Sequence, residues 1–173
     1  MKPLVKVPLK YGVIAGAVGA VVVIVLYYIN RHPFLIEVYM DFRVVLFGVF
    51  IFFALKELRE YHQDGILYFW QGLIASFVLV GTFAIVTSLA IFVFATVVPD
   101  FLQSYIRLMT ENLKAYPPEI IKQIGKDVYE RNLANLPSTN EFDLARLYFR
   151  NSYVIGLFVS IVLSVVLRRQ PKN

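Results

Sequence analysis

Apolar residues occur in four stretches along the chain, and the longest has no charged residue between Gly65 and Pro99. As a continuous helix at about 1.5 Å per residue, this stretch would be about 52 Å long, whereas the hydrocarbon core of a bilayer is only about 30 Å thick. It is therefore long enough to cross a membrane. Its first turns carry Tyr68 and Trp70, which are typical of a headgroup interface, so the pattern predicts a span over residues 72–97.

Three further apolar stretches predict membrane-spanning helices. The first covers residues 11–30 and the last covers residues 149–167, and basic residues border both. The second is unusual, because its strictly uncharged part, residues 44–55, would extend only about 18 Å as a helix. To cross a bilayer it needs the preceding turns as well, which predicts a span over residues 36–55 with a charged start.

Residues 100–136, between the third and fourth spans, alternate apolar and polar positions with the period of a helix. Pro117 and Pro118 interrupt the alternation, so it predicts two amphipathic helices, the second over about residues 119–133. These helices would form a hairpin outside the hydrocarbon. Residues 138–141, Ser-Thr-Asn-Glu, have the spacing of a capping box, which predicts that the helix of the fourth span begins there.

These elements predict an all-α fold, with one polytopic membrane domain over residues 1–173, four transmembrane helices and an extramembrane helical hairpin. Basic residues near span ends indicate orientation, because they resist translocation. They are concentrated in the amino-terminal segment, in the connection after the second span and in the tail, whereas the connection after the first span has few. We therefore expect both termini in the cytoplasm and residues 100–150 on the opposite side.

Small residues recur every four positions in the first span, at Gly12, Gly16 and Ala20. They would share one face of the helix, where the backbone of a neighbouring helix can approach closely. The pattern predicts a helix-packing face and carries no chemistry of its own.

The charged start of the second span is the candidate for intramembrane chemistry, because ionisable side chains inside a bilayer are costly. Glu37 and Asp41 are four residues apart, so on a continuous helix they would share a face, where two carboxylates repel each other and the pKa of one rises. Such a pair is the minimum for a proton or cation site. Arg43 would lie on nearly the opposite face, so we expect its partner on another helix, on the hairpin or in a lipid phosphate. The alternative is that all three residues lie at headgroup depth, with Arg43 extending outward.

Little else in the chain carries recognisable chemistry. It has no cysteine, which excludes thiol catalysis, disulfides and thiolate metal sites. His32 and His62 would lie on opposite sides of the membrane, so we expect no metal site from them. The sequence has no phosphate-loop, dinucleotide or serine-hydrolase motif, and we expect no catalytic residue and no cofactor. The net charge of +5 comes from basic residues beside apolar stretches, which favours anionic lipid as a partner and not nucleic acid.

Three short segments are similar to a known family: Lys-Tyr-Gly-x-Ile-x-Gly at residues 10–16, Gly-x3-Phe-x-Gln at residues 65–71 and Pro-Asp-Phe at residues 99–101. With them the chain resembles the four-span bacterial membrane proteins catalogued as domain of unknown function 4199, which are typical of the Bacteroidota. The resemblance implies the fold and a bacterial inner (cytoplasmic) membrane, in which residues 100–150 would be periplasmic. The family has no assigned activity, so no catalytic or binding residue follows from it.

These patterns favour a protein without enzymatic activity. We expect an accessory or scaffolding subunit of an inner-membrane complex, which contacts other membrane subunits or a second copy of itself through its spans and its hairpin. Two alternatives stay open. One is a small transporter or proton-coupled permeation unit that uses Glu37, Asp41 and Arg43, and the other is a membrane sensor whose external hairpin binds a ligand.

Overall fold

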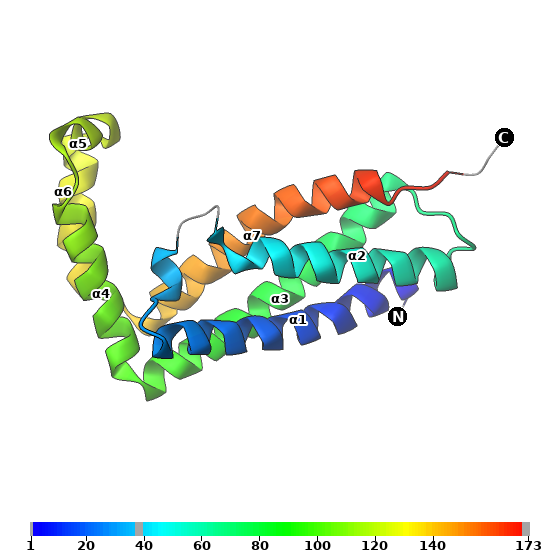
Figure 1. Ribbon diagram of the computed structural model, residues 1–173, viewed down its shortest axis with the longest axis horizontal. Coiled ribbons are helices and arrows are strands. Elements are labelled where there is room, and N and C mark those ends of the chain that lie inside the picture. The colour runs from blue at the N-terminus through cyan, green and yellow to red at the C-terminus, as the bar shows by residue number, and fades with distance from the viewer. Residues whose placement is uncertain (1, 37–39, 171–173) are drawn as a thin grey trace.

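The computed structural model describes residues 2–36 and 40–170. Within these ranges the chain folds into seven α-helices and two short 3-10 helices, which confirms the prediction of an all-α fold. Four long helices run alongside one another as an antiparallel bundle (Figure 1). They are α1 (Pro3–Tyr28), α2 (Phe42–His62), α3 (Phe69–Val97) and α7 (Glu141–Val166).

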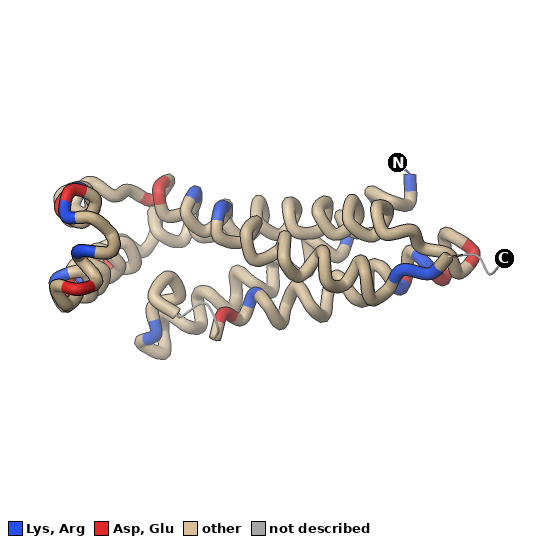
Figure 2. Tube along the Cα trace, turned by 90° about the horizontal axis from the view of Figure 1, so that it is seen from above, with Lys and Arg blue, Asp and Glu red and all other residues tan. Residues whose placement is uncertain are grey.

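In the described part of the chain, three of these helices, α1, α3 and α7, are long and apolar enough to cross a membrane. α2 does not belong to this group, because its last two turns are polar from Lys56 to His62. Lys, Arg, Asp and Glu gather mainly towards the two ends of the bundle and are sparse along its middle (Figure 2). The composition and length of the three helices imply a lipid environment.

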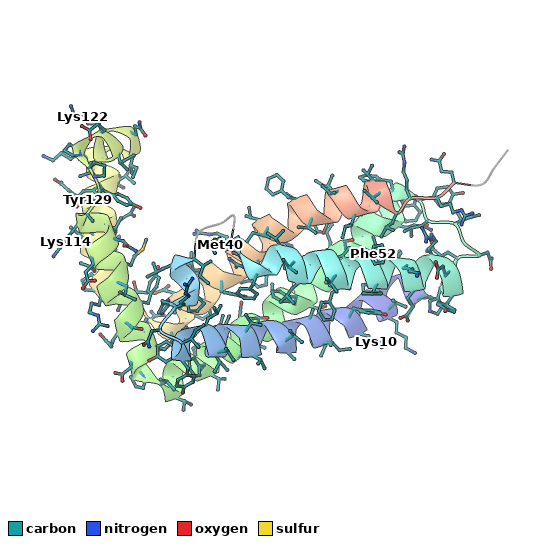
Figure 3. The ribbon with its side chains drawn as sticks, viewed as in Figure 1. Lys10, Met40, Phe52, Lys114, Lys122 and Tyr129 are labelled. Carbon is teal, nitrogen blue, oxygen red and sulfur yellow. The ribbon has the colours of Figure 1, made fainter. Side chains whose placement is uncertain are left out.

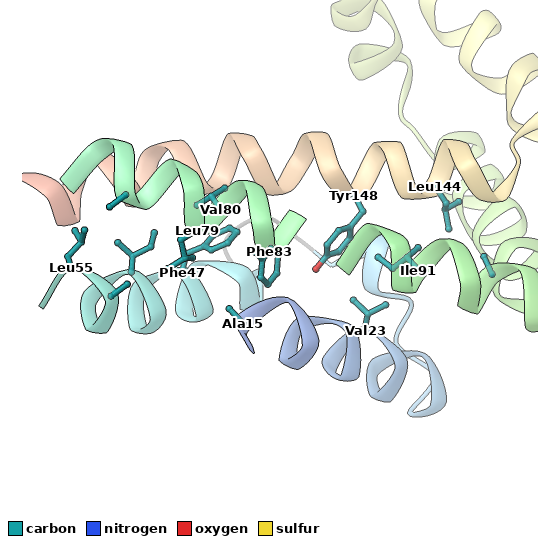
Figure 4. Close-up of a cluster of buried hydrophobic side chains, with 14 of the residues drawn as sticks. Ala15, Val23, Phe47, Leu55, Leu79, Val80, Phe83, Ile91, Leu144 and Tyr148 are labelled. Carbon is teal, nitrogen blue, oxygen red and sulfur yellow. The ribbon is translucent and has the colours of Figure 1, made fainter. Parts of the chain in front are cut away.

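The centre of the bundle is α3, which packs along both α1 and α7. Its side chains Leu79, Val80 and Phe83 are fully buried, and the ring of Phe83 meets that of Phe47 from α2 with centroids 4.7 Å apart (Figure 4). The outward faces of the four long helices carry exposed Val, Ile, Leu and Phe side chains. Helices that are apolar on both their buried and their exposed faces are typical of membrane bundles.

The small residues of α1 lie where this helix meets α3. A Cβ atom added at Gly12 or at Gly16 would lie 2.7 Å from a heavy atom of α3 in each case, so only glycine allows the observed approach. Ala20, one turn further along, is also buried. The Thr87 hydroxyl crosses the same interface and donates a hydrogen bond of 3.0 Å to the carbonyl oxygen of Gly16.

Three helices outside the bundle form what we call the arm: α4 (Pro99–Lys114), α5 (Pro118–Ile124) and α6 (Lys126–Asn135). The arm runs at a steep angle to the bundle, at the end opposite to the first turns of α1 and the last turns of α7 (Figure 1). Its far end, near Lys122, lies away from the bundle (Figure 3). A 3-10 helix, η3 (Leu136–Ser138), connects the arm to α7.

Two predicted helix boundaries in this region are wrong. The helix expected over residues 119–133 is divided at Gly125, whose φ of +93° is a conformation that L side chains rarely adopt. The cap of α7 is Asn140 and not Ser138. Its side chain accepts a hydrogen bond of 2.9 Å from the N–H of Asp143, whose carboxylate accepts one of 3.3 Å in return from the N–H of Asn140. A reciprocal capping box is therefore present, two residues later than predicted.

Candidate functional site

The connection between α1 and α2 brings charged groups into the bundle. It contains the 3-10 helix η1 (Pro33–Leu35) and ends at Asp41, the N-cap of α2. The Asp41 backbone is extended, and its Oδ1 accepts a hydrogen bond of 2.9 Å from the N–H of Arg43. A carboxylate in this position satisfies a free N–H group of the first turn and complements the positive end of the helix dipole.

The Arg43 side chain folds back onto the same carboxylate. Its Nε donates to Oδ1 and Oδ2 of Asp41 at 2.9 and 3.0 Å, and its Nη2 completes the ion pair. On the other side, Nη1 donates to Oγ of Ser152 in α7 at 3.2 Å, and the guanidinium lies 4.7 Å from the ring centroid of Tyr148. Asp41 and Arg43 are each only 8% exposed. We call Asp41, Arg43, Tyr148 and Ser152 the arginine cluster.

The expectation that Arg43 has its charged partner on another helix, on the hairpin or in a lipid phosphate is wrong, because that partner is Asp41. It assumed one continuous helix through both residues, on which positions two apart point away from each other. Because α2 begins at Phe42, and not at residue 36 where the span was predicted to start, Asp41 lies outside the helix and its side chain is free to turn towards Arg43. The expected repulsion between Glu37 and Asp41 on one helix face loses its basis for the same reason, and Glu37 itself lies outside the described residues.

The arginine cluster therefore consists of a charge-neutral, hydrogen-bonded pair that joins α2 to α7. A cavity of about 290 Å³ lies beside it, and Pro33, Asn151 and Val154 contribute to its wall together with the pair. A mutually neutralised pair of this kind is far less costly in a low-dielectric environment than an isolated guanidinium. The geometry suits a structural cross-link between two helices, with both charges already satisfied within the chain.

A buried histidine, which sequence reasoning did not single out for a structural role, forms a second polar centre. His32 is tied to the start of α4, where its Nε2 donates to the carbonyl oxygen of Phe101 at 3.2 Å, while its Nδ1 accepts from the N–H of Phe34 at 3.4 Å. Its ring stacks on that of Phe101 with centroids 4.9 Å apart and lies 5.6 Å from that of Tyr105. We call His32, Phe34, Phe101 and Tyr105 the aromatic corner.

Burial lowers the pKa of His32 below its ordinary value of 6.5 and outweighs the opposite effect of the hydrogen bond to the Phe101 carbonyl. The imidazole is therefore neutral at pH 7, with the proton on Nε2 that this hydrogen bond requires. His62 lies at the other end of α2, far from this centre. Among residues 2–36 and 40–170, no three His, Asp or Glu side chains come close enough together to hold a metal ion.

A family model described as protein of unknown function (DUF4199) matches residues 10–169, which confirms the resemblance noted in the sequence. The matched segment includes most of α1 and all of the other helices, and thus the arginine cluster, the arm and the aromatic corner. No curated protein and no solved structure matches the chain.

Proposed function

The chain belongs to the DUF4199 family of proteins of unknown function, and we propose that it is a non-enzymatic accessory or scaffolding subunit of a bacterial inner-membrane complex. In this proposal α1, α2, α3 and α7 all cross the membrane. Both termini are cytoplasmic, and the arm is periplasmic. The role of the bundle is to anchor and orient the arm, which offers its surface to a membrane protein partner.

The arginine cluster supports the proposal that α2 is a fourth span. The charged start of α2 was the obstacle to a crossing, and an ion pair with further hydrogen bonds reduces the cost of placing that start near the bilayer. Beyond it, Val45, Val49 and Phe53 are exposed on the outer face of α2, as lipid-facing side chains would be. The helix also packs along α1 and α7, which are themselves long enough to span.

The observation that carries the scaffolding role is the exposure of the arm. No residue of α5 or α6 is buried, and the apolar side chains of Ile124 and Val128 remain exposed near its far end. The aromatic corner nevertheless holds the base of the arm to the bundle. An ordered element that leaves apolar side chains uncovered is typical of a surface that docks onto another protein.

Affinity purification of the tagged full chain in a mild detergent tests this role. We expect a stoichiometric partner, either another membrane protein or a second copy of the chain. The double variant Ile124→Ser, Val128→Ser should lose that partner without a change in its own melting temperature. Gln123→Ser with Asn112→Ser is the matched control, because both residues are exposed polar positions on the same arm, and it should keep the partner. A monomer under all conditions, or a partner retained by the Ile124 and Val128 variant, would contradict the proposal.

The cavity beside the arginine cluster favours one alternative, a small transporter or proton-coupled permeation unit. The double variant Asp41→Asn, Arg43→Met distinguishes the two functions, because it removes both charges together and Asn is still a good N-cap. In reconstituted vesicles, a transporter that uses this pair would lose its flux. An accessory subunit would keep its partner in the same variant.

A further inference from the structure

A cavity of about 740 Å³ lies in the angle between the arm and the first turns of α7. Its lining is polar on both sides: Asn132 and Asn135 come from α6, Thr139 from the connection, and Arg146 and Arg150 from α7. The volume is within the range of about 300–1,000 Å³ that small-molecule sites occupy. The cavity thus has room for a ligand and a set of hydrogen-bond donors to hold it.

The charge of the lining indicates an anionic ligand. Arg146 is paired with Asp143 at 3.0 Å, so these two charges cancel. Arg150 has no ion pair within the described part of the chain, and its side chain is exposed. A guanidinium with amide and hydroxyl donors nearby matches the oxygen atoms of a phosphate group, to which arginine can donate two parallel hydrogen bonds.

The position of Arg150 along α7 indicates a lipid and not a water-soluble anion. Arg150 is the last charged residue before the uncharged residues 151–167, which places it at headgroup depth if α7 crosses the bilayer. Its helix face continues with Val154, Leu157 and Ile161, which recur every three or four residues and are all exposed. A phosphate in the cavity would therefore lie directly above an apolar stripe that can receive a hydrocarbon chain.

We propose that the arm and α7 form a site for an anionic phospholipid. Its phosphodiester contacts Arg150 within the cavity, and one acyl chain lies along Val154, Leu157 and Ile161. The site goes beyond the scaffolding role and does not depend on it, because the lipid would be bound by this chain alone.

Native mass spectrometry of the purified full chain in mild detergent tests the site with defined probes. Phosphatidylglycerol should bind. Diacylglycerol, which has the same chains without the phosphate, and glycerol 3-phosphate, which has the phosphate without the chains, should each bind at least about tenfold more weakly. Arg150→Gln should weaken binding of phosphatidylglycerol about tenfold. Arg131→Gln makes the same change on the arm outside the cavity, and this control should bind as the unaltered chain does.

Each alternative result overturns the proposal in a different way. Diacylglycerol that binds as tightly as phosphatidylglycerol would indicate an acyl groove without a headgroup site. Glycerol 3-phosphate that binds as tightly would indicate a site for a soluble phosphate compound. Undiminished phosphatidylglycerol binding by Arg150→Gln would exclude the contact itself. Asn135→Ala is a second test of the cavity, because it removes one lining amide and leaves every charge in place. This variant should also bind phosphatidylglycerol more weakly.

Discussion

Removal of Arg43 alone should destabilise the chain more than removal of Arg43 and Asp41 together. In Arg43→Met the Asp41 carboxylate stays buried without its partner, and the hydrogen bond to Ser152 and the contact with the Tyr148 ring are lost. In Asp41→Asn, Arg43→Met no charge remains, and the Asn side chain can still accept a hydrogen bond from the first turn of α2.

The magnitude follows from the burial of the pair. Leaving one member of a buried ion pair without its partner costs about 3–5 kcal/mol, whereas replacing both members with uncharged residues is often nearly neutral. The pair here also loses the Ser152 hydrogen bond, which contributes about 1.5–3 kcal/mol because its donor is charged. Because the Ser152 hydrogen bond is lost in both variants, we expect the free energy of unfolding to fall by about 4.5–8 kcal/mol in Arg43→Met and by about 1.5–3 kcal/mol in the double variant.

Equilibrium unfolding in detergent micelles, followed by circular dichroism, measures both values. Ser152→Ala is the matched control, because it removes the same hydrogen bond and leaves the ion pair intact. If the double variant is as unstable as Arg43→Met, the cost does not come from an uncompensated charge. If Arg43→Met is as stable as the unaltered chain, the pair is not buried as described. Either result would contradict a buried, mutually stabilising ion pair between Asp41 and Arg43.

Two further predictions concern helix packing and pH. Gly16→Ala should lower the free energy of unfolding by about 1–3 kcal/mol, because the new Cβ would lie 2.7 Å from the Cβ of Val86. Gly48→Ala is the control, because its new Cβ would meet nothing within 4 Å and should not destabilise the chain. The same unfolding measurement compares the two variants. The chain should lose stability as the pH falls below about 6.5, because the unfolded His32 then takes up a proton that the buried neutral ring resists. Melting temperatures at pH 7.5 and 5.5 measure this loss, which should be smaller in His32→Gln, and an unchanged pH dependence in that variant would contradict the role of His32.

The long helices could be predicted because their signal is local. A charge-free stretch of sufficient length predicts a membrane helix wherever it occurs, and α1, α3 and α7 all came from such stretches. The start of α2 could not be located in this way, because the charged residues before and at its start interrupt the apolar stretch that would mark a helix. The relation of Asp41 to Arg43 depends on whether the helix begins before or after Asp41, and that boundary is set by the preceding turn and by capping.

Contacts between distant segments were beyond sequence reasoning. His32 and Phe101 are 69 positions apart, and no periodicity connects them. Their meeting results from the parallel arrangement of α1 and α3, which brings the last turns of both helices, and the start of the arm after α3, to the same end of the bundle. The cavity near Arg150 also joins distant segments, because its lining comes from α6, from the connection and from α7. A local signal existed only for the arginine itself, as the last charge before an uncharged stretch.

Accessibility labelling is the most direct test of the claim that α2 crosses the membrane. The natural sequence has no cysteine, so the single substitutions His62→Cys, Gln123→Cys and Gln170→Cys each introduce one exposed thiol at the end of α2, on the arm and after α7. In intact spheroplasts of an expressing bacterium, a membrane-impermeant maleimide should react at Gln123→Cys, and it should react at the other two positions only after permeabilisation. Reaction at His62→Cys in intact spheroplasts, or reaction of Gln123→Cys and Gln170→Cys from the same side, would contradict the four-span arrangement.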